Sequence, residues 1–150
     1  MNIHNILHKL VVALVLLMGF GIALGWPQYK KHKNIVRAQQ ALDLGKEIAF
    51  HESKYKERTG RVLEDFTKLD LSVKCASQKA NDRTEMVCSP YVYWLKDGHI
   101  VRVDNTELPE WFEMDIDEGT VACSYMDGSW AGEHICDRMD LSSFAHNLVL

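Results

Sequence analysis

The chain has 150 residues, 47% of them hydrophobic, and a formal net charge of −4 that is unevenly distributed. Residues 1–59 carry nine Lys and Arg against four Asp and Glu, whereas residues 60–150 carry eight against 17. The acidic C-terminal part argues against nucleic acid as a partner, because it has no basic patch interleaved with aromatic residues. Beyond residue 26 the chain is long enough for one domain and too short for two.

The first predicted element is an apolar run at residues 10–26, which follows a short leader-like segment at residues 1–9. No charged residue lies between Lys9 and Lys30. As a helix, the run is at the lower limit for crossing a hydrocarbon core of ~30 Å. Three interpretations are open: a cleaved signal peptide, a permanent single-pass anchor, and the first half of a long helix that anchors a subunit and later packs it into a polymer.

Two observations favour a retained helix over a signal peptide. The run of 17 residues exceeds a signal-peptide core, which typically has about 7 to 15, and Trp26 at its end suits a membrane interface. Two signals conflict on how this helix would be oriented in a membrane. The positive-inside rule would place the basic cluster at residues 30–33 in the cytoplasm. The cysteines favour the opposite orientation, and we give them more weight.

Residues 27–59 predict an amphipathic helix that continues the apolar run. One face carries, at spacings of three and four, Ile35, Ala38, Ala41, Leu42, Gly45, Ile48, Ala49 and Tyr55. We expect Pro27 to kink the helix without ending it and Gly60 to cap it in a left-handed conformation. A helix over about residues 8–58 would be ~75 Å long. The C-terminal part is too short to cover such a helix, so half of it must be buried elsewhere.

The four cysteines, Cys75, Cys88, Cys123 and Cys136, all lie in the C-terminal part. They form two pairs with 12 intervening residues each. Three disulfide connectivities are open, and local pairing is the simplest. Zinc is disfavoured because there is no C-x-x-C knuckle. Since disulfides form in oxidising compartments, they place the C-terminal part outside the cytoplasm.

Residues 60–150 predict a disulfide-stabilised globular head. Residues 60–71 link the helix to the head, and we expect Phe66 and Leu69 in this linker to pack on the helix. The polar tract at residues 76–85 predicts a surface loop. The clearest strand signal is Asp97-Gly98 between two β-rich runs, which predicts a two-residue hairpin. The residues expected to face the helix are Tyr91, Tyr93, Leu95, Val101 and Val103.

Beyond this hairpin, the sequence predicts two further strands at residues 111–116 and 120–125. The C-terminal tail holds the apolar residues Leu141, Phe144, Leu148 and Val149. Their spacing predicts a final helical turn or an edge strand.

Few residues suggest chemistry. Asp115, Asp117 and Glu118 alternate like oxygen ligands for calcium, but the EF-hand spacing is not met and a solvated turn is the preferred interpretation. The seven histidines lack metal-ligand spacing, and no serine lies in a nucleophile motif. We therefore expect neither catalytic residues nor a cofactor. Trp130 lies in a glycine-flanked loop, where it could contact another subunit or a ligand or, in the preferred interpretation, cover a disulfide.

Several segments, taken in order, resemble a known family. The apolar run ends in Trp26-Pro27-Gln28-Tyr29, and residues 37–44, Arg-Ala-Gln-Gln-Ala-Leu-Asp-Leu, open the amphipathic part of the helix. The helix end at Gly60 precedes the segment at residues 65–70, Asp-Phe-Thr-Lys-Leu-Asp. Near the C terminus, the second cysteine pair resembles a disulfide-closed loop. Together these features resemble the type IV pilins and the major pseudopilins of type II secretion, well over the first 71 residues and loosely over the cysteines.

The chain departs from this family where processing and assembly are encoded. Pilin precursors carry Gly followed by an aromatic residue at the peptidase site and Glu at the fifth mature position. Alignment on Pro27 places Asn5 and Ile6 at the cleavage point and Leu10 at the position of the Glu. The single Gly-Phe pair, Gly19-Phe20, lies too far inside the apolar run.

The resemblance implies an α+β fold, in which a long kinked N-terminal helix, membrane-spanning in its first half, packs on an antiparallel sheet of three or four strands. It implies a structural subunit of a pilus-like or pseudopilus filament, with other pilin-like subunits, the inner membrane and the assembly machinery as partners. Its head would be extracytoplasmic, and a mature N terminus at Ile6 would be methylated. The alternative is a secreted or single-pass, disulfide-bonded binding domain that never polymerises.

Overall fold

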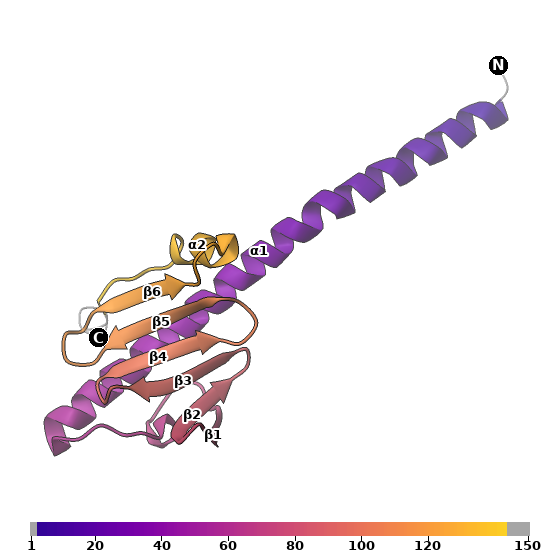
Figure 1. Ribbon diagram of the computed structural model, residues 1–150. Coiled ribbons are helices and arrows are strands. Elements are labelled where there is room, and N and C mark those ends of the chain that lie inside the picture. Colours follow the sequence, from indigo (N-terminus) through magenta and orange to yellow (C-terminus); the bar gives the residue numbers. More distant parts are fainter. Residues whose placement is uncertain (1–2, 144–150) are drawn as a thin grey trace. The chain divides into compact units, whose positions relative to one another are not determined.

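The computed structural model describes residues 3–143 and is of the α+β class, with one long helix and one antiparallel sheet (Figure 1). The helices are α1 (Ile3–Thr59) and α2 (Trp130–Cys136), with the short 3-10 helix η1 (Phe66–Lys68). The strands are β1 (Ala76–Ala80), β2 (Arg83–Cys88), β3 (Tyr91–Lys96), β4 (Ile100–Asn105), β5 (Glu110–Asp115) and β6 (Val121–Tyr125). They pair in sequence order, each antiparallel to the next, so the sheet is a six-stranded meander.

The chain divides into two compact units, Met1–Val36 and Arg37–Leu150. This boundary lies ten residues beyond Trp26, where the sequence divides the apolar from the amphipathic half of the helix. In the first unit, the described residues form the N-terminal part of α1, and Pro27 lies inside this helix without ending it. This part is long and apolar enough to cross a membrane, a criterion that a signal sequence also meets.

In the second unit, the remainder of α1 packs on one face of the sheet (Figure 1). The helix buries Ala38, Ala41, Leu42, Leu44, Ile48 and Ala49. Small residues let the two backbones approach closely. At Gly45, an added Cβ would lie 2.6 Å from Cε of Met114 on β5 and 3.0 Å from Cγ2 of Val103 on β4. The apolar stripe read from the sequence is thus the face that meets the sheet.

The central hairpin follows its predicted pattern on the helix-facing side. Tyr91, Tyr93, Val101 and Val103 are buried against α1, as the alternation predicts, and Leu95 packs at the margin of the core. Asp97 and Gly98 both have positive φ, as a type I′ turn requires. The connection nevertheless has three residues and not two, because Lys96 pairs with Ile100.

The prediction of three or four strands is wrong, because the sheet has six. The polar tract at residues 76–85, expected to be a loop, contains β1 and the start of β2, joined at Asn81 and Asp82 with φ of 50° and 62°. Strand β1 lies at the sheet edge, and four of its five residues are exposed. A strand that buries neither face needs no alternation of apolar and polar residues, so the period-2 signal is missing.

The linker and tail are only partly as expected. Gly60 has φ of 71° and donates its N–H to the carbonyl of Lys56, which confirms the left-handed cap. Phe66 is buried in the core and Leu69 packs against it, as predicted. Leu141 lies in neither a helix nor a strand, whereas Phe144, Leu148 and Val149 lie outside the described residues.

Two disulfides stabilise the margins of the sheet. Cys75 bonds Cys88, and Cys123 bonds Cys136, with Cα–Cα distances of 5.2 and 5.6 Å. The first ties the segment before β1 to the end of β2, and the second ties β6 to α2. Each closes a loop with a sequence separation of 13. In the chain-entropy account, such loops contribute about 3 kcal/mol each to the free energy of unfolding.

Candidate functional site

The N-terminal part of α1 presents a continuous apolar surface. From Ile6 to Ile22 its large apolar side chains have exposed fractions between 41% and 73%. A shallow apolar groove of about 460 Å³ runs along one side. Its lining residues are Leu7, Leu10, Val11, Leu14, Val15 and Met18. An apolar surface of this extent requires lipid or protein to cover it, since soluble monomers rarely expose one.

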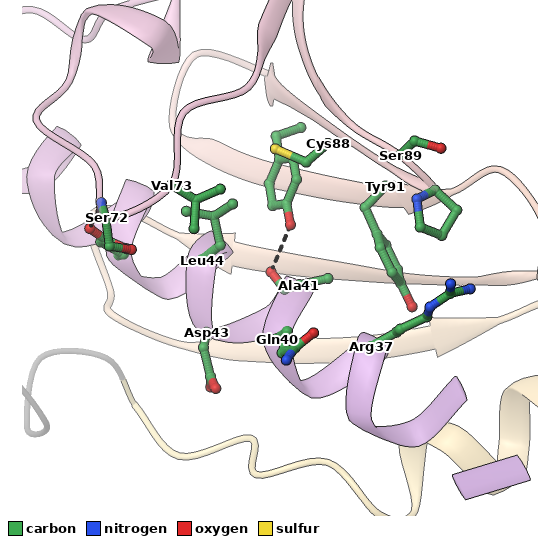
Figure 2. A pocket seen from close by; sticks show the side chains of 13 residues that line it. Arg37, Gln40, Ala41, Asp43, Leu44, Ser72, Val73, Cys88, Ser89 and Tyr91 are labelled. Atoms are coloured by element: carbon green, nitrogen blue, oxygen red, sulfur yellow. Dashed lines mark hydrogen bonds between the residues drawn. The ribbon is translucent and has the colours of Figure 1, made fainter. Parts of the chain in front are cut away.

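The second unit contains an open groove of about 570 Å³ beside α1 (Figure 2). One wall is the helical segment from Arg37 to Glu47, and the others come from Ser72–Val73 and from the turn that joins β2 to β3. Leu44, Val73 and Tyr91 supply apolar surface, while Arg37 and Asp43 lie at the edge. The groove can hold an apolar or aromatic group. Two serines line it, Ser72 and Ser89, and the hydroxyl of Ser72 donates to the carboxylate of Glu47.

Hydrogen bonds fix the walls of this groove. Tyr93 Oη donates to the carbonyl of Ala41 at 3.2 Å, drawn as a dashed line in Figure 2, and this bond ties β3 to α1. The carboxylate of Glu47 accepts from the backbone N–H of Ser72 at 2.6 Å and also from its hydroxyl. The groove is therefore held by three segments that are distant in sequence.

A buried carboxyl group lies behind the groove. Glu110, on β5, accepts hydrogen bonds from Asn105 Nδ2 at 2.5 Å and from Tyr91 Oη at 3.4 Å. Burial raises the pKa of the Glu110 carboxyl. Burial, reinforced by the charge of Glu110, also raises the pKa of Tyr91, which stays a neutral phenol. These groups therefore brace β3, β4 and β5 against one another.

A second buried carboxyl group, Glu52, lies on α1. Its exposed fraction is 0%, and Oε2 accepts the backbone N–H of Leu63 at 2.8 Å. Oε1 accepts no hydrogen bond from any described residue. Burial raises the pKa of Glu52 to about 7 from its ordinary value of 4.5. Glu52 is not among the residues that the sequence pointed to, although it follows Ile48 by four positions and so interrupts the apolar stripe.

The acidic side chains of the turn between β5 and β6 make hydrogen bonds and an ion pair within the protein. Asp115 Oδ1 accepts the backbone N–H groups of Asp117 and Glu118 at 2.9 and 3.0 Å. Asp117 pairs with Lys56 near the end of α1. Among the described residues, no group of three His, Cys, Asp or Glu side chains is arranged to hold a metal ion. The geometry supports the interpretation of these residues as a turn.

The prediction that Trp130 lies in a loop is wrong, because Trp130 is the first residue of α2. Ser129 caps this helix, with Oγ accepting the N–H of Gly132 at 3.1 Å. Trp130 is 60% exposed, and its ring stacks on that of His134, with ring centroids 5.4 Å apart. Ser129 is a residue type that often caps the N terminus of a helix, and this was the sequence signal that could have revealed α2.

The sheet face that does not meet α1 carries charged and aromatic side chains that bind one another. The guanidinium of Arg83 lies 3.7 Å from the Trp94 ring centroid, and that of Arg102 lies 4.8 Å from the Trp111 ring centroid. Arg102 also pairs with Asp104 at 2.8 Å. The charged and aromatic side chains of this face therefore stabilise it by binding to one another.

Asn5 and Ile6, the positions aligned with pilin processing, lie within the first turns of α1. Searches against protein-family models, curated proteins and solved structures find no match to this chain.

Proposed function

We propose that the chain is a pilin-like structural subunit, anchored by the N-terminal part of α1 in the bacterial inner membrane with its disulfide-bonded head outside the cytoplasm. The observation that carries the proposal is that one helix has two different surfaces. Its N-terminal part exposes large apolar side chains on all sides, whereas residues 38–49 bury one stripe against the sheet. The proposed assembly into a filament rests on the resemblance of the chain to type IV pilins and pseudopilins.

On assembly, the apolar part of the helix exchanges lipid contacts for contacts with the helices of neighbouring subunits. Both surroundings are apolar, so hydrophobic free energy changes little and packing contacts must direct the exchange. An assembly motor would drive it. The acidic head then forms the filament surface. The proposal includes no catalytic role and no cofactor.

Cross-linking through the apolar segment tests the polymer. In cells that produce the full chain with both Leu14→Cys and Ala23→Cys, an oxidant should give ladders longer than a dimer. The two thiols lie on opposite sides of the helix, so each chain can be linked to two neighbours. These ladders should occur in surface material released by shearing. The control carries Lys79→Cys and Asp127→Cys, two exposed positions of the head, and should give no such ladder. If the Leu14→Cys, Ala23→Cys chain never exceeds a dimer and never enters the sheared material, the filament role is excluded.

The open groove beside α1 favours a second candidate, a binding domain that never polymerises. The mass of the mature N terminus separates the candidates. A start at Ile6, N-methylated, would indicate pilin-type processing, whereas a start at Trp26 would indicate a cleaved signal peptide and a free domain. An intact Met1 would indicate a static anchor.

A further inference from the structure

The segment that follows the apolar run carries aromatic and basic side chains on one side of α1. We propose that Trp26, Tyr29, Lys30 and Lys33 form a binding site for the phosphate-bearing headgroup of an anionic phospholipid. We call these four residues the headgroup site. The inference rests on the proposed insertion of α1 into a membrane and adds to it the lipid class that the helix selects.

The spacing of the four residues places them together. They lie at i, i+3, i+4 and i+7, so at about 100° per residue they fall within an arc of about 100°. All four are exposed in the structure, and Trp26 and Tyr29 have exposed fractions of 61% and 62%. Lys31 lies outside this arc, which makes it a natural comparison.

The axial positions match the depth of a lipid headgroup layer. Trp26 ends the apolar run, and Lys33 lies about 10 Å further along the helix. The polar layer on each side of a bilayer is about 5 to 7 Å thick. Side chains on a helix lean toward its N terminus, so the amines of Lys30 and Lys33 lean back toward the apolar run.

The geometry at Lys30 agrees with this direction. Its Nζ lies 5.9 Å from the centroid of the Trp26 ring, one turn closer to the apolar run. A phosphate at this depth would meet two ammonium groups, and the two aromatic rings would lie against the glycerol and upper acyl chains. The two lysines of the headgroup site, with no acidic side chain among residues 26–36, favour an anionic over a zwitterionic headgroup.

The site also gives a reason for a basic cluster on the extracytoplasmic side. The positive-inside rule would place residues 30–33 in the cytoplasm, whereas the two disulfides place the head outside it. Anionic lipid in the outer leaflet would neutralise the cluster where it lies. The basic residues then set the depth of the helix instead of its orientation.

The test uses the full chain in nanodiscs that contain phosphatidylcholine and phosphatidylglycerol. Native mass spectrometry of the released protein should show preferential retention of phosphatidylglycerol. Lys30→Gln with Lys33→Gln should lower this preference by about fivefold for each lysine, which corresponds to about 1 kcal/mol per basic residue at a lipid surface. The matched control, Lys31→Gln with Lys74→Gln, removes the same charge and should keep the preference.

Equal retention of both lipids by the unmodified chain would overturn the headgroup site, and so would an equal loss of lipid preference in the two double variants. A loss of contact between copies without a change in lipid retention would also overturn it, because the cluster would then bind the acidic head of a neighbour. Resistance of the nanodisc-bound chain to alkaline extraction is measured separately. A chain that inserts but shows no lipid preference loses the headgroup site alone, whereas a chain that does not insert loses the proposed anchor as well.

Discussion

Glu52 is the residue that should make the stability of the protein depend most clearly on pH. The carboxyl group is fully buried, with one oxygen on the Leu63 N–H. Its pKa is about 7 in the folded protein and near 4.5 when exposed. The folded protein therefore holds the proton more tightly between these values, and the free energy of unfolding should fall as pH rises through them.

We expect the free energy of unfolding to fall by about 3 kcal/mol between pH 4 and pH 8 on account of Glu52, levelling off above pH 8. Glu52→Gln keeps an oxygen for the Leu63 N–H and removes the ionisation, so its pH dependence should be flatter. Urea denaturation at a series of pH values measures this. Glu110 contributes in the same direction in both proteins. Identical pH slopes in the two proteins would contradict the assignment.

At the scale of elements, the contact of α1 with the sheet depends on Gly45. A Cβ there would lie within 3.0 Å of atoms on both β4 and β5. We expect Gly45→Val to lower the free energy of unfolding by about 1 to 3 kcal/mol, the range for an overpacked core. Asp43→Val, on the exposed side of the same helix, is the control for helix propensity. Comparable losses in the two variants, by chemical denaturation, would show that close packing at Gly45 is not the cause.

At the scale of the whole molecule, the two units should separate physically. The second unit contains the core, both disulfides and the whole sheet. We expect a chain that begins at Ile35 to be a soluble monomer with cooperative thermal unfolding, because the apolar surface that needs a cover has been removed. Size exclusion and circular dichroism measure these properties. Aggregation or the absence of a folded signal would show that the N-terminal part of α1 is needed for the head to fold.

Much of this architecture can be predicted from local sequence patterns. The helix, its apolar stripe, the cap at Gly60 and the inward face of the β3–β4 hairpin each follow from the spacing of a few residues. The same holds for the apolar run, since its length and its lack of charge can be read without a fold. These features depend on periods of 3.6 and 2 that any buried face imposes on a sequence.

Other features were decided only in three dimensions. The β1–β2 hairpin buries little, so it leaves no period in the sequence, and its pairing with β3 is what makes it part of the sheet. Likewise, Glu52 and Glu110 look like solvated charges until the linker and the sheet cover them. The three walls of the groove also come from segments far apart in the chain.

The sequence by itself determined that an apolar helix runs into an amphipathic one and that an acidic, cysteine-bearing domain follows. Only the tertiary structure decided which cysteines pair, how many strands the sheet has and which charged groups are buried. The physical reason is that these properties depend on contacts between distant residues. Spacing along the chain reports only the faces that an element must bury.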